Sequence, residues 1–166
     1  MDPFPPVATY VRDQCAIIHR NKDRFGPLSN MHGGFPLVVD GVAYGTSEAL
    51  YQAQRFPHRP DLPELVTGAS GAWAAKQVSI LYQAETRADW EMVRVEVMLW
   101  CLRAKLAQHG GVLCPLLVST SPMPIVELSY RDGFWGAQPQ PENPTQLIGR
   151  NALGRAWMVL REAAER

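Results

Sequence analysis

Two carboxylates, Glu127 and Asp132, and the adjacent aromatic residues Phe134 and Trp135 fall within residues 125–136, which have the sequence IVELSYRDGFWG. The apolar residues at its start predict a segment anchored in a core, and the step from Asp132 to Gly133 predicts a turn. An acid and the ring of Trp135 on a rigid turn can hold a sugar or a base during a reaction. The alternative is structural, with Asp132 capping the turn and Trp135 filling the core. For the other acid, Glu127, we expect only a structural hydrogen bond.

Lys105 lies on a segment whose apolar residues recur at helical spacing. It follows Met98 by seven residues, Cys101 by four and Leu102 by three, which places it on or beside the apolar stripe of the helix. A lysine that loses its water there has a lowered pKa, and its neutral amine can act as a nucleophile or a base. A lysine at the edge of the stripe instead extends its amine to solvent. From spacing alone the solvated lysine is favoured.

Glu48 begins a predicted helix and has two polar neighbours on the same face. Tyr51 and Gln52 follow it by three and four residues, so the three side chains share one side of the helix. This cluster can hydrogen-bond a ligand at the mouth of a cleft. The alternative is a carboxylate that interacts only with the helix dipole, on a polar helix edge.

Four other positions carry weaker signals. Lys76 can contact a phosphate or remain solvated, and Trp90 can stack on a base or fill the core. Asn30, in a predicted loop, can face a ligand or close a turn. Residues 149–155, with the sequence GRNALGR, enter a predicted helix, and a glycine-rich helix start can bind phosphate through its N–H groups. The segment has neither the Walker A spacing nor a dinucleotide fingerprint.

A scaffold of helices with a small hairpin is expected to position these residues. The predicted helices are residues 46–56, 61–67, 71–83, 89–108 and 151–165. The first has a threonine or serine N-cap and ends before two prolines, and the fourth ends at a glycine pair. Residues 35–39 and 42–44 predict a hairpin, because Asp40 and Gly41 between them favour a tight turn.

The remaining segments predict a first strand and several loops. Residues 1–9 are proline-rich and predict a loose lead-in, and residues 11–18 predict the first strand. Turn-forming residues predict loops over 21–34 and 137–145, whereas the apolar residues 112–119 are either helical or extended. The sequence therefore predicts a single α+β domain that is mostly helical, with a small antiparallel β-hairpin.

The composition restricts the class of protein. With 166 residues, 46% of them hydrophobic, the chain can build one sizeable globular core. Sixteen basic and sixteen acidic residues cancel, so no overall field attracts the protein to nucleic acid or to a membrane. Three cysteines without CxxC spacing and four scattered histidines predict neither a disulfide framework nor a metal site. No signal peptide or membrane-spanning stretch is predicted, which indicates a cytoplasmic protein.

Several motifs occur together in one order. The chain resembles the NADAR (YbiA-like) family over about residues 22–162, through the motifs YGTSEALYQAQRF, DWEMVRVEVMLWCLRAKLAQH, IVELSYRDGFWG and GRNALGRAWMVLR. The segment FGPLSNMHGGFPLVVDG resembles the family's N-terminal loop and hairpin. The SEALYQ motif is similar to one subgroup, whereas other members have a histidine after the glutamate, as in SEHYFQ. We therefore expect a lead-in with a first strand over residues 1–20 and a NADAR domain over residues 21–166.

The resemblance implies an N-glycosidase that cleaves a ribose C1–N bond without a cofactor. One activity of the family removes ADP-ribose from guanine bases in DNA, which reverses a DarT-like toxin, and another cleaves early riboflavin-pathway intermediates. We expect the first activity, with ADP-ribosylated nucleic acid or an ADP-ribose-containing small molecule as the partner and no membrane. The alternatives are the riboflavin intermediates and a non-catalytic ADP-ribose-binding module. A diphosphate is expected at the N–H groups near residues 149–151 and at Arg150.

The resemblance also implies a set of site residues. Some members form a Schiff base between a lysine and the opened ribose, and here Lys105, in the motif RAKLAQH, is preferred over Lys76. Glu48 and Asp132 are expected to stabilise charge or move protons. The residues expected to bind the substrate are Asn30, Tyr51, Gln52, Trp90, Trp135, Gly149, Arg150 and Asn151. Asp132 and Trp135 are expected on one wall of a ribose-binding cleft, with Glu48 and Lys105 on the opposite wall.

Overall fold

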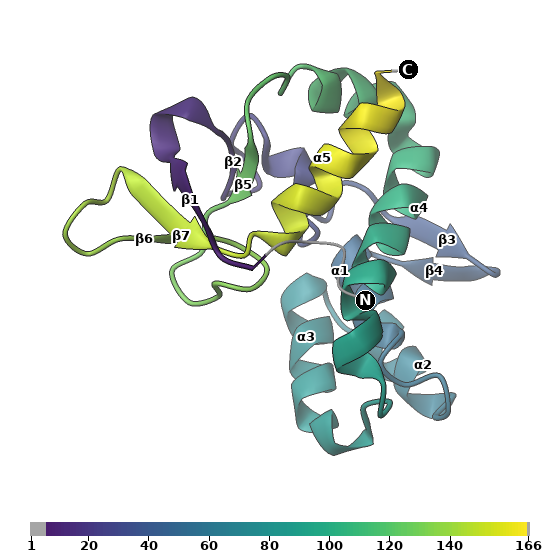
Figure 1. The fold of residues 1–166 in the computed structure, drawn as a ribbon. Helices are drawn as coiled ribbons and strands as arrows, with labels where there is room; N and C mark the ends of the chain where they lie inside the picture. The colour runs from purple at the N-terminus through teal and green to yellow at the C-terminus, as the bar shows by residue number, and fades with distance from the viewer. Residues whose placement is uncertain (1–5, 166) are drawn as a thin grey trace. The chain divides into compact units, whose positions relative to one another are not determined.

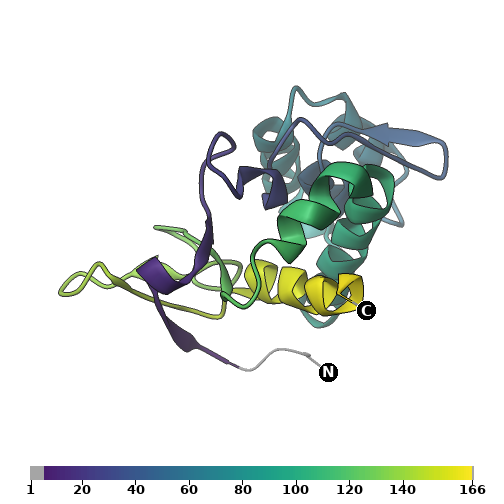
Figure 2. The same cartoon turned by 90° about the horizontal axis from the view of Figure 1, so that it is seen from above.

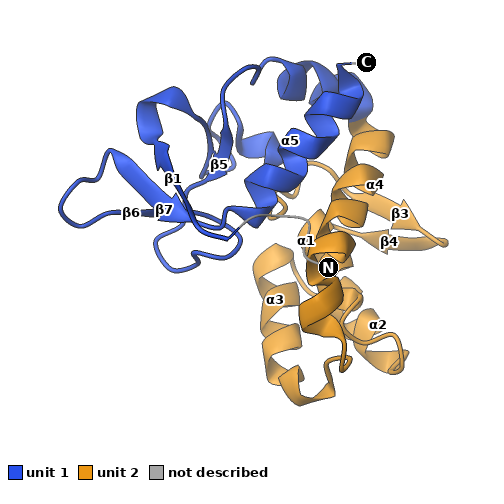
Figure 3. Cartoon of the chain, viewed as in Figure 1, with its two compact units in different colours: residues 1–29, 110–166 blue, residues 30–109 orange. Residues whose placement is uncertain are grey.

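The structure, a computed structural model, describes residues 6–165, which contain five α-helices and seven short strands (Figure 1). The predicted α+β class, mostly helical with a small antiparallel hairpin, is confirmed. The chain divides into two compact units (Figure 3). Unit 2 is residues 30–109, and unit 1 combines residues 1–29 with residues 110–166.

The hairpin of unit 2 forms where the sequence predicts it. Strand β3 (Leu37–Val39) pairs antiparallel with β4 (Val42–Tyr44). Asp40 and Gly41 between them have φ angles of 50° and 78°. Two successive residues with positive φ match the right-handed twist of the strands, and aspartate and glycine adopt such angles readily.

Three helices follow the hairpin and pack against one another: α1 (Ser47–Ala53), α2 (Asp61–Gly68) and α3 (Ala72–Leu81). The Thr46 hydroxyl caps α1 by accepting a hydrogen bond from the Ala49 N–H at 3.0 Å. The prediction that this helix extends to residue 56 is wrong, since α1 ends at Ala53. The chain turns there and buries the Phe56 side chain completely, and Pro57 disfavours helical angles in the residue before it.

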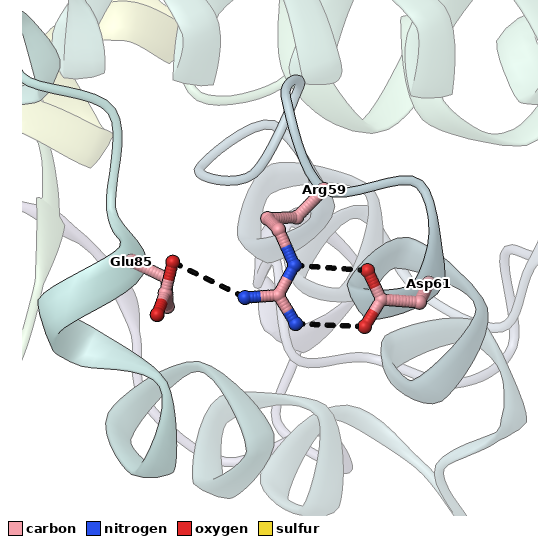
Figure 4. Close-up of polar contacts among 3 residues, drawn as sticks. All are labelled: Arg59, Asp61 and Glu85. Carbon is pink, nitrogen blue, oxygen red and sulfur yellow. Dashed lines mark hydrogen bonds and ion pairs between the residues drawn. The ribbon is translucent and has the colours of Figure 1, made fainter.

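An arginine holds the segment before α2 to the segment after α3. The Arg59 guanidinium forms two parallel hydrogen bonds to Asp61, at 3.0 and 2.9 Å, and lies 3.1 Å from a Glu85 oxygen (Figure 4). Glu85 belongs to the short helix η3 (Gln83–Glu85). Because all three side chains are substantially exposed, this network contributes little to the free energy of unfolding.

The longest helix, α4 (Trp90–Val118), does not stop at the predicted glycine pair. It kinks at His109, whose φ and ψ of −126° and 24° are not helical, and then continues. Neither Gly110 nor Gly111 adopts the positive φ of a terminating glycine. The segment beyond the kink buries Leu113 and Leu117, so packing keeps residues 112–118 helical. The helical alternative for that segment is therefore the correct one.

Unit 1 holds two small sheets. Strand β7 (Gln146–Gly149) pairs antiparallel with β1 (Ala8–Val11) and with β6 (Gln138–Pro139). Strand β2 (Ala16–Ile18) pairs parallel with β5 (Ile125–Glu127). The β6–β7 hairpin extends as an arm from the N-terminal end of α5 (Figures 1 and 2).

Two predictions for unit 1 are wrong. The single strand predicted over residues 11–18 is interrupted by the short helix η1 (Arg12–Gln14), because three successive polar residues cannot continue the apolar pattern. The loop predicted over residues 137–145 contains β6, where Pro139 is tolerated on an edge strand. The lead-in predicted over residues 1–9 includes residues 1–5, which lie outside the described residues, and its last two residues belong to β1.

The core of unit 1 lies between these strands and helix α5 (Ala152–Ala164). Val126, Leu128, Ala137 and Leu147 form one buried cluster. The predicted loop over residues 21–34 contains the short helix η2 (Gly26–Leu28), and the Leu28 carbonyl accepts a hydrogen bond from the buried Trp157 indole at 2.7 Å. Within residues 6–165, no helix combines the length and the apolar character needed to cross a lipid bilayer.

Candidate active site

The Glu48 carboxylate is buried near the start of α1 and is held at both oxygens. One oxygen accepts a hydrogen bond from the Asn30 amide, and the other accepts one from the Gln52 amide at 2.7 Å. The Glu48 N–H also donates to the Asn30 carbonyl, at 2.9 Å. The two side-chain amides fix the position of both carboxyl oxygens. Glu48 therefore does more than interact with the helix dipole.

Tyr51 and Trp90 form an aromatic wall in the same unit. Both are buried, their ring centroids are 5.0 Å apart, and the planes are tilted by 50°. Burial raises the pKa of the Tyr51 hydroxyl, and the negative charge of Glu48 raises it further. Tyr51 and Gln52 thus share the surroundings of Glu48, as their spacing predicts.

Several buried polar atoms of unit 2 have no hydrogen-bond partner among the described residues, and three of them lie on or beside the segment of Glu48 and Trp90. These three are Gln52 Oε1, Trp90 Nε1 and Arg55 Nε. Buried polar groups in folded proteins are nearly always hydrogen-bonded, so these atoms are candidates for contact with a ligand. Gln52 presents an acceptor, whereas the tryptophan and the arginine present donors.

Lys105 is fully buried on α4, which excludes the solvated lysine that its spacing favours. Its ammonium nitrogen lies 4.9 Å from the centre of the Phe35 ring. Loss of water lowers the pKa of Lys105 to about 7, which gives a large neutral fraction at neutral pH. Cys101, one turn earlier on α4, has its pKa raised by burial and by the charge of Glu48. The carboxylate therefore acts electrostatically on the turn of α4 that precedes Lys105.

Lys76 has different surroundings. It is half-buried on α3, where its carbonyl accepts a hydrogen bond from the Ser79 hydroxyl at 2.8 Å. Of the two candidate lysines, Lys105 is the one whose amine is removed from water.

In unit 1, Asp132 is half-buried and caps a turn. One of its oxygens accepts hydrogen bonds from the Phe134 and Trp135 N–H groups, both at 2.9 Å. The structural alternative therefore describes this oxygen correctly. The other oxygen accepts no hydrogen bond from the described residues and can still contact a ligand. The Trp135 ring packs edge-to-face against Phe134, with centroids 5.0 Å apart.

The N–H groups at the start of α5 do not form the predicted phosphate cradle. Those of Arg150 and Asn151 donate to the carbonyls of Gly133 and Gly136, at 2.7 and 3.0 Å. Gly149 is required by close packing, because a Cβ atom there would lie 2.3 Å from the Gly136 carbonyl oxygen. These donors are used within unit 1, so the turn and the helix start hold each other.

The Asn151 side chain is likewise used within unit 1. Its amide nitrogen donates to the Ile125 carbonyl at 2.8 Å, and its oxygen accepts from the Glu127 N–H at 3.0 Å. The Arg150 guanidinium lies 4.9 Å from the centre of the Phe134 ring.

The predicted site residues fall into two groups. Unit 2 holds Asn30, Glu48, Tyr51, Gln52, Lys76, Trp90 and Lys105, and unit 1 holds Asp132, Trp135, Gly149, Arg150 and Asn151.

Sequence reasoning did not identify Arg55 as a site residue. Its guanidinium carbon lies 5.0 Å from the centre of the Trp90 ring. The only available signal is its spacing, four residues after Tyr51 and seven after Glu48 on the helix predicted over residues 46–56, although α1 itself ends at Ala53. Within residues 6–165, no group of three histidine, cysteine or acidic side chains is placed to bind a metal ion.

Comparison with known proteins identifies the family. A model of the NADAR domain matches residues 17–164. The chain is 32% identical to N-glycosidase YbiA of Escherichia coli (strain K12) over 152 residues, which cover 92% of this chain and 89% of that protein. It is 33% identical over 156 residues to a riboflavin biosynthesis protein of Vibrio vulnificus (strain YJ016), covering 94% of this chain and 40% of that one.

The fold agrees with a solved structure. The NMR structure of Escherichia coli YbiA matches with a TM-score of 0.73 at 32% identity, over 93% of this chain and 90% of that chain. The chain belongs to the NADAR domain family, which confirms the resemblance carried by its motifs.

Proposed function

We propose that this protein is an N-glycosidase that hydrolyses the bond between ribose C1 and a nitrogen atom. The observation that carries this proposal is the presence of two buried ionisable groups in unit 2. The Glu48 carboxylate is fixed by two amides, and the fully buried Lys105 amine has a pKa of about 7. A carboxylate offsets the positive charge that develops on the sugar as the C1–N bond breaks. Similarity to proteins named N-glycosidase YbiA supports the same activity.

In the proposed mechanism the neutral Lys105 amine attacks ribose C1. The C1–N bond breaks, and its electron pair stays on the leaving nitrogen, which takes up a proton from the attacking amine through Glu48. The ring oxygen then leaves C1 and takes the second amine proton, so that the opened sugar is bound as an imine. Water adds to the imine, releases the ribose and restores the amine.

The polar and aromatic groups around Glu48 have binding roles in this proposal. The unpartnered Gln52 Oε1 accepts a hydrogen bond from a ribose hydroxyl, which orients the sugar over the carboxylate. Tyr51 and Trp90 enclose the site and exclude water, which strengthens the effect of the Glu48 charge. Asn30 fixes the carboxylate.

For the substrate, we propose ADP-ribosylated guanine in DNA, with ADP-ribose released and a DarT-like toxin as the functional counterpart. The family's known activity on this substrate supports the proposal, as does a buried lysine suited to imine formation. A second candidate is a riboflavin-pathway intermediate. The name of the Vibrio vulnificus relative, a riboflavin biosynthesis protein, favours that candidate.

The experiment incubates the protein separately with ADP-ribosylated DNA and with early riboflavin-pathway intermediates and measures base or ring release by mass spectrometry. Turnover of one substrate and not the other identifies the substrate class. If neither is cleaved but ADP-ribose binds, the protein is a binding module and the N-glycosidase proposal is wrong.

The lysine is tested with Lys105→Ala and the matched variant Lys76→Ala. Borohydride reduction during turnover should add the mass of the opened sugar to Lys105, and Lys105→Ala should lose both the adduct and turnover. An adduct on Lys76 would transfer the proposed role to that residue. Full activity of both variants with no adduct would exclude the imine.

A further inference from the structure

A cationic and aromatic cluster in unit 2 has donors that the mechanism above does not use. The Arg55 guanidinium lies over the Trp90 ring, 5.0 Å from its centre, and Trp90 packs in turn on Tyr51. Stacking on an indole fixes the plane of a guanidinium and leaves its edge free to donate hydrogen bonds.

Two donors of this cluster are buried without an acceptor among the described residues. They are Arg55 Nε and Trp90 Nε1, and the whole Trp90 residue is only 3% exposed. Because the guanidinium lies over the indole, both donors belong to one small region. Two donors and a full positive charge, with no acceptor between them, match an anionic oxygen better than a nucleobase edge, which presents donors as well as acceptors.

Charges of both signs act on the Tyr51 hydroxyl. The pKa of the Tyr51 hydroxyl is raised by burial and by Glu48, whereas the positive charges of Arg55 and Arg94 act in the opposite direction. Tyr51 thus lies within electrostatic reach of a carboxylate and of two guanidinium groups. A ribose phosphate undergoing C1–N cleavage also carries both charges, with a cationic centre at C1 and an anion at the phosphate.

Arg59, four residues further along the chain, provides a comparison because its guanidinium has ion-pair partners within the protein. Arg59 directs its guanidinium at the carboxylates of Asp61 and Glu85 (Figure 4). Arg55 forms no ion pair with the residues that the structure describes, and its Nε atom is buried. The two arginines therefore form a matched pair of equal charge, one with its partners in the protein and one without.

We propose that Arg55 and the Trp90 indole N–H form a subsite for the phosphate carried on C5 of the ribosyl substrate. The identity of the sugar rests on the proposed N-glycosidase function, but the recognition of phosphate rests on the two unpartnered donors. The subsite explains how a protein of zero net charge selects an anionic substrate: the selection is local. It also fixes the sugar from its far end, which orients C1 toward the catalytic groups.

The experiment measures binding of ribose 5-phosphate and of ribose by isothermal titration calorimetry to the wild type, Arg55→Gln, Trp90→Phe and the control Arg59→Gln. The wild type should bind the phosphate at least about tenfold more tightly than the neutral sugar. Arg55→Gln should remove that preference, and Trp90→Phe should weaken it by about threefold to tenfold, since it keeps the ring but loses the N–H. Arg59→Gln should keep the full preference. Thermal unfolding of each variant checks that it folds.

Either of two binding results would overturn the subsite: a wild type without phosphate preference, or an Arg55→Gln variant that keeps it. Turnover assays are independent of both. A protein that shows an Arg55-dependent phosphate preference but cleaves neither candidate substrate has the subsite and lacks the proposed activity. A protein that cleaves a substrate equally well with and without its 5′-phosphate has the activity, and then the phosphate assignment is wrong.

Discussion

The two carboxylates that the sequence singles out are held in opposite ways. Glu48, in unit 2, is buried, and both of its oxygens accept hydrogen bonds from side-chain amides. Asp132, in unit 1, is half-buried, and one oxygen accepts two backbone N–H groups of its own turn. Side chains hold the first carboxylate in place, whereas the second carboxylate holds the backbone in place.

From this difference we infer a functional role for Glu48 and a structural role for Asp132. Removing water from a carboxylate is costly, and a fold keeps such a group where its charge is needed. Glu48 is also accompanied by a buried amine and by unpartnered polar atoms in the same unit. Asp132 is accompanied by a turn whose carbonyls accept hydrogen bonds from the start of α5. On this comparison we propose that Glu48 is the charge that acts on the substrate and that Asp132 shapes its own segment.

The largest expected effect is on turnover. Glu48→Gln keeps the shape of the side chain but removes its charge, so kcat should fall by about 10³-fold, while far-UV circular dichroism stays unchanged. Asp132→Asn keeps an oxygen that can cap the turn, so its kcat should fall by less than about tenfold. Steady-state kinetics of the two variants on the same substrate provide the measurement. Equal losses would show that Asp132 also takes part in the reaction and would end the distinction.

The second prediction concerns the free energy of unfolding, which burial of Lys105 lowers. The folded protein has a Lys105 pKa of about 7, and the unfolded chain has the usual 10.5. Between these values the unfolded chain binds a proton that the folded protein does not. The free energy of unfolding should therefore rise with pH by about 1.4 kcal/mol per unit over that range. Below about pH 7 Lys105 is protonated in both states, so it no longer changes the free energy of unfolding with pH.

Lys105→Met should remove this slope and stabilise the protein by about 3 kcal/mol at pH 8. The measurement is urea unfolding at several pH values, with Lys76→Met as the control because Lys76 is only half-buried. A Lys105→Met protein with the same pH slope as the wild type would show that the amine keeps its proton in the fold. Lys105 could then not serve as the nucleophile of unit 2, because a protonated amine does not attack C1.

The third prediction is the pH dependence of catalysis. Only the neutral amine attacks C1, so kcat/KM should rise about tenfold per pH unit below about pH 7 and level off above it. From pH 5 to the plateau above pH 7 this amounts to about 100-fold. Rates measured on one substrate across this range give the profile, and the trapped imine should follow the same curve. A flat profile below pH 7 would exclude a titrating lysine.

Local features of the molecule could be predicted from the sequence. The hairpin follows from Asp40 and Gly41, and the shared face of Glu48 and Gln52 follows from helical spacing, since each depends on neighbouring residues alone. The capped turn at Asp132 was one of the two predicted alternatives for the same reason.

Features that depend on distant parts of the chain could not be predicted. Strand β7 pairs with β1, where Ala8 lies opposite Gly149, and neither strand shows a clear alternation of apolar residues. Burial of Lys105 also depends on contact with residues such as Phe35, which lie far away in the sequence and which helical spacing does not reveal. Arg55 lies beyond the end of α1, so helical spacing alone did not connect it with Trp90.

The smallest expected effect tests the structural side of the comparison. Asp132→Ala leaves the Phe134 and Trp135 N–H groups without their acceptor, which should lower the free energy of unfolding by about 1–2 kcal/mol in urea unfolding experiments. Asp132→Asn retains an acceptor and should recover most of that loss. If the alanine variant is as stable as the wild type, the turn does not depend on Asp132. The carboxylate would then have no structural task, and its second oxygen, which accepts no hydrogen bond from the described residues, would make it a candidate for contact with the substrate.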